Sequence, residues 1–298
     1  MKKVVDKVAT RRRVGHFVKL FRPKQWIKNL FVFAAIAFSN NILNVEYFKQ
    51  TVYAFLCFCL ISSCVYIFND LVDVEKDRQH PKKKFRPIAS GVISKKEALL
   101  VLFLAAIGGI TTSFLIEKLF GIIVLGYLIN NVIYSFKLKH LVILDVMSIA
   151  FGFLLRVIAG AAVIHVDVSP WLLLCTLLLS LFLGFSKRRN ELVVLVGNAD
   201  KHRKILDEYS LEFIDHMLAI VTASTVMAYS LYTFSERENK YMMLTIPFVL
   251  YGIFRYQYIV YKKSEGGSPE EILLTDLPLL INVVLWVMSC ISIISFLE

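Results

Sequence analysis

Nine long runs of apolar residues alternate with short polar connections along the chain. They fall at about residues 26–40, 50–68, 97–116, 119–136, 141–164, 170–186, 212–234, 241–261 and 277–297. The runs lack the apolar/polar alternation of a half-buried strand, so each predicts a helix. Most approach the roughly 20 apolar residues that a helix needs to cross about 30 Å of hydrocarbon. The first and the sixth are short, and they predict a tilted or re-entrant segment.

The pattern predicts an all-α, polytopic membrane protein with about nine transmembrane helices. Inside hydrocarbon only helices and closed barrels satisfy their own backbone groups. Of the 298 residues 57% are hydrophobic and the mean hydropathy is +0.64, which excludes an ordinary soluble domain. We expect residues 1–298 to form a single membrane-embedded domain, with a basic segment at 1–22 and no removable signal peptide.

Basic residues are concentrated on alternate connections, although the net charge of +11 by itself could suggest a nucleic-acid partner. Most of the 34 Lys and Arg residues lie in the N-terminus or at 69–96, 137–140, 187–210 and 262–276. The opposite connections carry only Lys49, Lys118, Arg237 and Lys240. The positive-inside rule then places the N-terminus and the loops 69–96 and 187–210 in the cytoplasm, and the C-terminus outside the plasma membrane. The surplus suits anionic lipid headgroups and needs no nucleic acid.

An acidic stretch directly follows the second apolar run. Asp70, Asp73 and Asp77 are spaced three and four residues apart and would share one face of a continuing helix. With Asn69 they offer the hard oxygen ligands that suit Mg²⁺, which takes its other ligands from water and substrate phosphates. The cations that follow suit those phosphates; they are Lys82, Lys83, Lys84 and Arg86. The stretch therefore predicts a metal and phosphate site, with a solvated loop of mixed charge as the alternative.

Further polar residues occur where other runs meet the same membrane face. They are Lys24 and Lys28 in the first run, Tyr134 and Lys139 after the fourth, and Lys187, Arg188 and Glu191 after the sixth. Lys24 and Lys28 share a helix face and would contact either headgroups or substrate phosphates. A second acidic group precedes the seventh run and contains Asp207, Glu208, Glu212 and Asp215. It fits a weak second metal site, but we prefer acids placed favourably around a helix N-terminus.

Two arginines interrupt apolar runs, where a charge is costly and indicates function by default. Arg156 lies in the middle of the fifth run, and we expect it to face substrate; the alternative is an ion pair with Asp145. Arg255 lies near the cytoplasmic end of its run and is expected to be structural.

The motif Asn69-Asp70-x-x-Asp73-x-x-x-Asp77 after a second span resembles the UbiA superfamily of intramembrane prenyltransferases. Typical members carry a second aspartate-rich motif after the sixth span, where this chain has Lys187-Arg188-Arg189-Asn190-Glu191. This departure makes the chain similar to the branch of decaprenyl-phosphate phosphoribosyltransferases. The chain also resembles that branch at residues 22–26, 69–88, 134–135 and 138–139 and at Arg156. That branch transfers 5-phosphoribose from phosphoribosyl diphosphate to a polyprenyl phosphate, toward the arabinose donor of the cell envelope.

The resemblance implies a UbiA-like bundle with a cavity at the cytoplasmic side, and it suggests a role for each polar residue. Asn69, Asp70, Asp73 and Asp77 would hold Mg²⁺, with Asp73, Asp77 and Glu191 catalytic. Donor phosphates would meet Lys24, Lys28, Tyr66, Lys83, Lys84 and Arg86. The lipid phosphate would meet Lys139, Arg156 and Lys187, with Tyr134 and Arg188 as further substrate contacts. Because the lipid phosphate is already an anionic nucleophile, no strong base is needed.

Two other functions stay open. An aromatic-acceptor prenyltransferase of the UbiA type would use an isoprenyl diphosphate and would need Asp207 and Asp215 beside Asp73. A non-enzymatic transporter would carry matched helix interruptions in two repeated halves, and the chain has none that we recognise. The sequence allows a homo-oligomer without predicting one.

Overall fold

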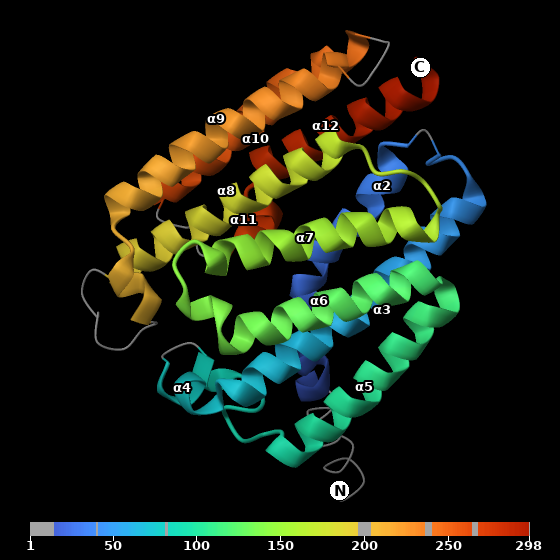
Figure 1. Ribbon diagram of the computed structural model, residues 1–298. Helices are drawn as coiled ribbons and strands as arrows, with labels where there is room; N and C mark the ends of the chain where they lie inside the picture. The colour runs from blue at the N-terminus through green and yellow to red at the C-terminus, as the bar shows by residue number, and fades with distance from the viewer. Residues whose placement is uncertain are drawn as a thin grey trace, which may run out of the picture.

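Figure 1 shows the computed structural model, in which residues 15–39, 41–80, 83–195, 204–235, 240–263 and 268–297 are described. Across these ranges the chain forms helices and turns without a strand, which confirms the all-α fold. The long helices are α3 (Val45–Val72), α5 (Lys95–Ile116), α6 (Lys118–Phe136), α7 (Leu144–Val163), α8 (Pro170–Leu195), α9 (Leu211–Ser235), α10 (Ile246–Tyr258) and α12 (Leu277–Phe296).

Shorter helices connect or extend the long ones. They are η1 (Pro23–Phe33), α2 (Ala34–Ala37), α4 (Val74–Gln79), η2 (Lys83–Phe85), η3 (Leu138–His140), η5 (Lys204–Glu208), η6 (Lys240–Thr245), η7 (Ile259–Lys263) and α11 (Pro269–Thr275). Polar caps fix several starts: Ser94 and Glu97 form a capping box at α5, and Asp276 caps α12.

Eight helices in the described part are long and apolar enough to cross a membrane. The seventh of these includes η6 and η7 on either side of α10. The prediction of a short sixth span is wrong, because α8 continues to Leu195. It continues past the apolar run since its polar residues find partners; Arg188, for example, pairs with Asp145 of α7.

The first apolar run forms an irregular segment rather than a regular spanning helix. Pro23–Phe33 is an 11-residue 3₁₀-helix, and α2 adds four residues. A 3₁₀-helix rises about 2.0 Å per residue, so the two together extend over about 28 Å. That length is close to the thickness of the hydrocarbon, and the ninth crossing stays a prediction.

The long helices lie side by side in a fixed order. Figure 1 shows α9, α10 and α12 at one side, then α8, α7 and α6 with α3, and α5 at the other side. The contacts between neighbouring helices agree with this order. The segment η1 packs against α3 and α7, in the interior of the bundle.

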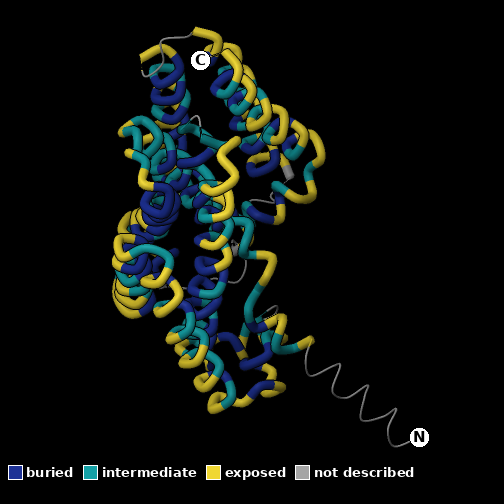
Figure 2. The backbone as a smooth tube through the Cα atoms, turned by 90° about the vertical axis from the view of Figure 1, so that its right-hand side faces the viewer, coloured by how far each residue is buried: buried dark blue, intermediate teal, exposed yellow. Residues whose placement is uncertain are grey.

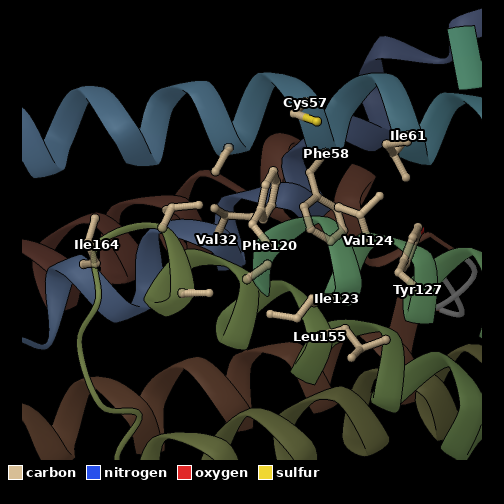
Figure 3. Packing of buried hydrophobic residues seen from close by; sticks show 14 of the residues in the cluster. Val32, Cys57, Phe58, Ile61, Phe120, Ile123, Val124, Tyr127, Leu155 and Ile164 are labelled. Carbon is tan, nitrogen blue, oxygen red and sulfur yellow. The ribbon is translucent and has the colours of Figure 1, made fainter. Parts of the chain in front are cut away.

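A continuous apolar core joins η1, α3, α6 and α7. Figure 3 shows Phe58 of α3 against Phe120 and Tyr127 of α6, with Val32 of η1 and Leu155 of α7 beside them. A second core joins α8 to α12, around Phe182, Ile214 and Tyr256. The two cores stand on either side of a cavity, so the bundle has two packed halves.

The outer surface of the spans is apolar. Figure 2 shows buried positions along the inside and exposed ones on the outer face of the helices. Exposed positions include Leu99, Phe103 and Leu115 of α5, and Ile122 and Ile129 of α6. A large apolar surface of this kind suits lipid rather than water. The chain is therefore an integral membrane protein.

Candidate active site

A cavity of about 780 Å³ runs between the two halves of the bundle. One part is lined by polar side chains of η1, α3, α6 and α8: Lys28, Tyr66, Asn69, Tyr134, Lys187 and Arg188. The other part is lined by apolar and aromatic side chains that include Phe38, Trp171, Leu172, Trp286 and Ile291. A cavity of this shape suits a ligand with an anionic head and a hydrocarbon tail.

Asp70 of α3 and Asp77 of α4 both pair with Arg86. Arg86 Nη1 lies 2.9 Å from Asp70 Oδ1 and 2.5 Å from Asp77 Oδ2. Asp70 also accepts a hydrogen bond from Arg22, whose guanidinium lies over the ring of Tyr66. Both carboxylates are almost fully buried, so the guanidinium groups balance their charge.

Asp73 lies apart from that pair. It ends α3, and its two oxygens lie 3.0 and 3.2 Å from Lys139 Nζ. The carboxylate keeps a quarter of its surface exposed, whereas Lys139 is buried. Asn69, one turn earlier on α3, lines the cavity, and its Oδ1 accepts a hydrogen bond from Ser135. Asp73 is therefore the accessible carboxylate of the motif.

Arg156 lines the cavity deep within α7. Its guanidinium donates hydrogen bonds to Asn29 Oδ1 at 2.8 Å, to the Gly152 carbonyl at 2.8 Å and to Tyr127 Oη at 2.9 Å. None of these three oxygens belongs to a carboxylate. The expected alternative, an ion pair with Asp145, is therefore wrong, because Asp145 bonds to Arg188. The positive charge of Arg156 is held in place and faces the cavity.

Arg188 has two carboxylate partners. Its Nε lies 2.6 Å from Asp145 Oδ2, and its Nη1 lies 2.5 Å from Glu191 Oε2. Asp145 also accepts a hydrogen bond from Tyr209 at 2.8 Å. These contacts hold α8 in an orientation in which Lys187 lines the cavity.

A buried carboxylate faces the cations of the cavity. Glu270 of α11 accepts a hydrogen bond from Gln25 Nε2 at 2.6 Å, and its Oε2 lies 3.3 Å from Lys28 Nζ. Burial raises the pKa of Glu270, but the charge of Lys28, a backbone hydrogen bond, Gln25 and the charge of Lys187 outweigh it. The pKa therefore lies below its ordinary value.

The model of the UbiA prenyltransferase family matches residues 29–273. The chain belongs to the UbiA prenyltransferase family. A decaprenyl-phosphate phosphoribosyltransferase of Mycolicibacterium smegmatis is 34% identical over 92% of this chain and 91% of its own length. One from Mycobacterium tuberculosis H37Rv is 31% identical, with 95% of each chain covered.

A solved structure shows the same fold. A UbiA homolog from Archaeoglobus fulgidus bound to GPP and Mg²⁺ superposes with a TM-score of 0.72 at 21% identity, covering 94% of this chain and 99% of that one. The resemblance seen in the aspartate motif is thus confirmed, and the chain is a transferase of the UbiA family.

The structure gathers many of the UbiA site residues that the sequence predicted. Seven of them line the cavity: Lys28, Tyr66, Asn69, Tyr134, Arg156, Lys187 and Arg188. Others form the ion pairs around it: Asp70, Asp73, Asp77, Arg86, Lys139 and Glu191. Lys83 and Lys84 lie in η2 close to the mouth, and Lys24 and Lys84 are exposed. Lys82 lies outside the described residues.

Asp215 of the second acidic group bonds to residues in α8 and η7 rather than in the aspartate motif. Asp215 accepts hydrogen bonds from Arg189 at 2.7 Å and from Tyr261 at 2.8 Å. Across the described ranges no three His, Cys, Asp or Glu side chains gather to hold a metal. Arg255, expected to be structural, pairs with Asp276 through two hydrogen bonds.

Several polar residues that line the cavity or hold its lining side chains and the nearby Asp70 were not predicted as site residues. Asn29 and Tyr127 hold Arg156, Gln25 holds Glu270, and Arg22 holds Asp70. Glu270 follows a Gly-Ser-Pro turn, where an acid is common at a helix start, so its sequence gives little signal. Arg22 and Gln25 belong to the stretch 22–26 that carries the resemblance to the phosphoribosyltransferase branch, but the sequence assigned them no partner.

Proposed function

We propose that the chain transfers 5-phosphoribose from phosphoribosyl diphosphate to a polyprenyl phosphate such as decaprenyl phosphate. The relatives that match over nine tenths of the chain carry this activity in their names. The observation that carries the proposal is the cavity, which joins a cationic end to an apolar end. Its cationic end has Lys187 where typical members of the family place a second acidic motif.

A bound Mg²⁺ fits the residues at the mouth of the cavity. Asn69 and Asp73 offer an amide and a carboxylate oxygen one helical turn apart, and Mg²⁺ commonly uses one or two such ligands together with substrate phosphates. We infer that these two residues hold it, as UbiA homologs solved with Mg²⁺ suggest for the fold. When bound, it would neutralise the diphosphate and make it a better leaving group. A metal role for Asp70 and Asp77 stays a prediction, since both pair with arginine.

The cations would divide between the two substrates. Lys28 and Lys187 face the polar end, where they would hold the diphosphate, while Lys83, Lys84 and Lys24 near the mouth would hold the 5-phosphate. Arg156 lies deeper, where it would receive the phosphate of the lipid. Lys139 would act through Asp73, which it holds at 3.0 Å.

The reaction is a substitution at the anomeric carbon of the ribose. An oxygen of the lipid phosphate forms a bond to this carbon, and the bond from the carbon to the diphosphate breaks. The diphosphate leaves with the electron pair, and positive charge develops on the ribose, as in glycosyl transfer generally. Holding two charged reactants in this geometry supplies much of the rate. Glu191 would stabilise this positive charge only weakly, because its carboxylate already pairs with Arg188.

The tail of the lipid would lie along the apolar part of the cavity, and the active site would face the cytoplasm. The product would then serve the synthesis of the arabinose donor of the cell envelope. This last role rests on the resemblance to the named branch.

The test uses the purified protein in detergent with radiolabelled phosphoribosyl diphosphate, decaprenyl phosphate and Mg²⁺. We expect label in the organic phase, and its loss when EDTA removes the divalent ions. Label that appears instead when isoprenyl diphosphate and an aromatic acid are supplied would overturn the proposal and return the chain to the aromatic-acceptor branch.

A further inference from the structure

The cavity is lined by several buried polar atoms that make no hydrogen bond in the described part of the chain. In the described part of the chain five buried side-chain atoms have no hydrogen bond, and three belong to residues that line this cavity. These three atoms are Ser180 Oγ, Tyr256 Oη and Glu270 Oε2. Buried polar atoms normally find partners. Their gathering at one cavity indicates a ligand that brings polar groups of its own.

The charge of Glu270 is unexpected in this place. A carboxylate repels the phosphate groups that Lys28 and Lys187 would attract. Balancing the charge of Lys28 explains only part of the reason for a carboxylate here, because Lys28 also donates a hydrogen bond to Gln25 Oε1 at 2.6 Å. Gln25 in turn uses Glu270 Oε1, so Oε2 forms the ion pair with Lys28 at 3.3 Å and accepts no hydrogen bond.

A carboxylate oxygen accepts hydrogen bonds and donates none when it is ionised. The lowered pKa of Glu270 keeps it ionised at neutral pH. Its ligand must therefore donate, as a hydroxyl group does. Tyr256 lines the same cavity, and its buried hydroxyl makes no hydrogen bond within the described part of the chain, so it offers a second polar group to the ligand.

Resting on the function proposed above, we propose that Glu270 Oε2, with Tyr256 Oη, binds a ring hydroxyl of the ribose of the donor. The residue would thereby select a sugar diphosphate over an isoprenyl diphosphate. An isoprenyl chain has no hydroxyl, so it would leave this buried oxygen without a hydrogen bond, with only the ion pair to Lys28 beside it. Sites built to bond a substrate hydroxyl reject analogues that lack it far more strongly than apolar pockets reject extra groups.

The experiment measures how well sugar phosphates inhibit transfer by the full-length protein in detergent. The probes are ribose 5-phosphate, 2-deoxyribose 5-phosphate, which lacks one ring hydroxyl, and xylose 5-phosphate, which inverts the other. The wild type should bind ribose 5-phosphate at least about tenfold better than one of the two analogues, as expected for a hydrogen bond to a charged group.

The Glu270→Gln variant should bring that ratio to within about twofold. The matched control is Glu271→Gln, which removes the same charge from the neighbouring, exposed position of α11 and should keep the wild-type ratio. Where a variant is inactive, the same ratio is measured from the shift in melting temperature that each sugar phosphate produces.

A structural role for Glu270 gives a different result. If it served only to balance Lys28, the double variant Lys28→Met with Glu270→Gln would regain the sugar preference; we expect the preference to stay lost. A wild-type protein that transfers phosphoribose but shows no preference, or a Glu270→Gln variant that keeps it, overturns this inference alone. A wild-type protein that transfers no phosphoribose overturns the proposed function.

Discussion

At the scale of single residues, the three aspartates of the motif differ in their partners. Asp73 keeps exposed surface beside Lys139, whereas Asp70 and Asp77 are buried against arginines. The predicted continuous helix is interrupted at Asp73, so Asp70 lies in α3, Asp77 lies in α4, and Asp73 stands between the two helices. The motif thus separates an accessible carboxylate from a buried ion-pair cluster.

We expect Asp73→Asn to lower phosphoribosyl transfer by two orders of magnitude or more while the protein stays folded in detergent, because the amide oxygen can still accept a hydrogen bond from the buried Lys139. The variant keeps the size of the side chain but removes the negative charge that a divalent cation needs. The measurement is label in the lipid phase, together with thermal unfolding in detergent. Asp215→Asn is the control, because Asp215 bonds to Arg189 and Tyr261, and it should retain most activity. Full transfer by Asp73→Asn would refute the metal assignment.

Asp70→Asn should act on stability first. Asp70 is 3% exposed and pairs with both Arg22 and Arg86, so the variant leaves two half-buried guanidinium groups without the carboxylate that they share. Breaking a buried pair in this way costs about 3–5 kcal/mol, and partial exposure of the arginines favours the lower end. The check is a melting temperature lower than that of Asp73→Asn. Equal melting temperatures for the two variants would contradict this distinction.

Arg156→Lys should weaken the lipid substrate selectively. The guanidinium of Arg156 uses three donors at once on Asn29, Gly152 and Tyr127, a geometry that an ammonium group does not reproduce. We expect the KM for polyprenyl phosphate to rise about tenfold and the KM for phosphoribosyl diphosphate to change little. Steady-state kinetics with each substrate varied in turn measures this, and a rise confined to phosphoribosyl diphosphate would assign Arg156 to the donor.

Sequence reasoning found the residues whose type is costly in a membrane. Arg156, Lys187 and the aspartate motif stood out because charge next to hydrocarbon is rare. Glu270 and Gln25 did not, because acidic and amide residues are ordinary in a connection. Their function depends on α11 folding into the cavity mouth, and only tertiary structure brings Gln25 and Glu270 together across 245 residues.

At the scale of helices, continuous apolar runs predicted the spans well, since burial in lipid requires uninterrupted hydrophobic length. The runs did not predict where the helices end. α8 extends into charged residues because Asp145 on α7 pairs with Arg188, a contact that no local pattern encodes. The first run also folds as a 3₁₀-helix, which fits between α3 and α7.

Close contact between η1 and α7 depends on Gly160. A Cβ atom at this position would lie 1.9 Å from the carbonyl oxygen of Val32, which is backbone and cannot turn away. We expect Gly160→Ala to destabilise the protein by about 2 kcal/mol or more. Gly126→Ala in α6 is the matched control, because a Cβ there meets no atom within 4 Å; it should be neutral or stabilise by up to about 1 kcal/mol. Thermal unfolding of both variants in detergent gives the comparison, and equal stability would contradict the close approach.

At the scale of the whole molecule, the sidedness of the bundle determines which compartment supplies the donor. α5 has 22 residues, so its ends lie about 33 Å apart and Lys96 and Lys118 lie on opposite membrane surfaces if it crosses. The distribution of Lys and Arg predicts that Lys96 faces the cytoplasm. A soluble donor with three phosphates would then reach the cavity mouth from the compartment that makes it.

Lys96→Cys and Lys118→Cys test this in intact cells with a membrane-impermeant maleimide. Both positions are exposed, while four of the five native cysteines are buried, so the unmodified chain gives the background. We expect Lys118→Cys to react in intact cells and Lys96→Cys only after the membrane is permeabilised. The reverse pattern would place the aspartate motif outside the cell, where a cytoplasmic donor does not reach it. Reaction at both sites in intact cells would show that α5 does not cross the membrane. Only the expected pattern is consistent with a charged donor entering beside Asp73 while the lipid phosphate enters from the bilayer.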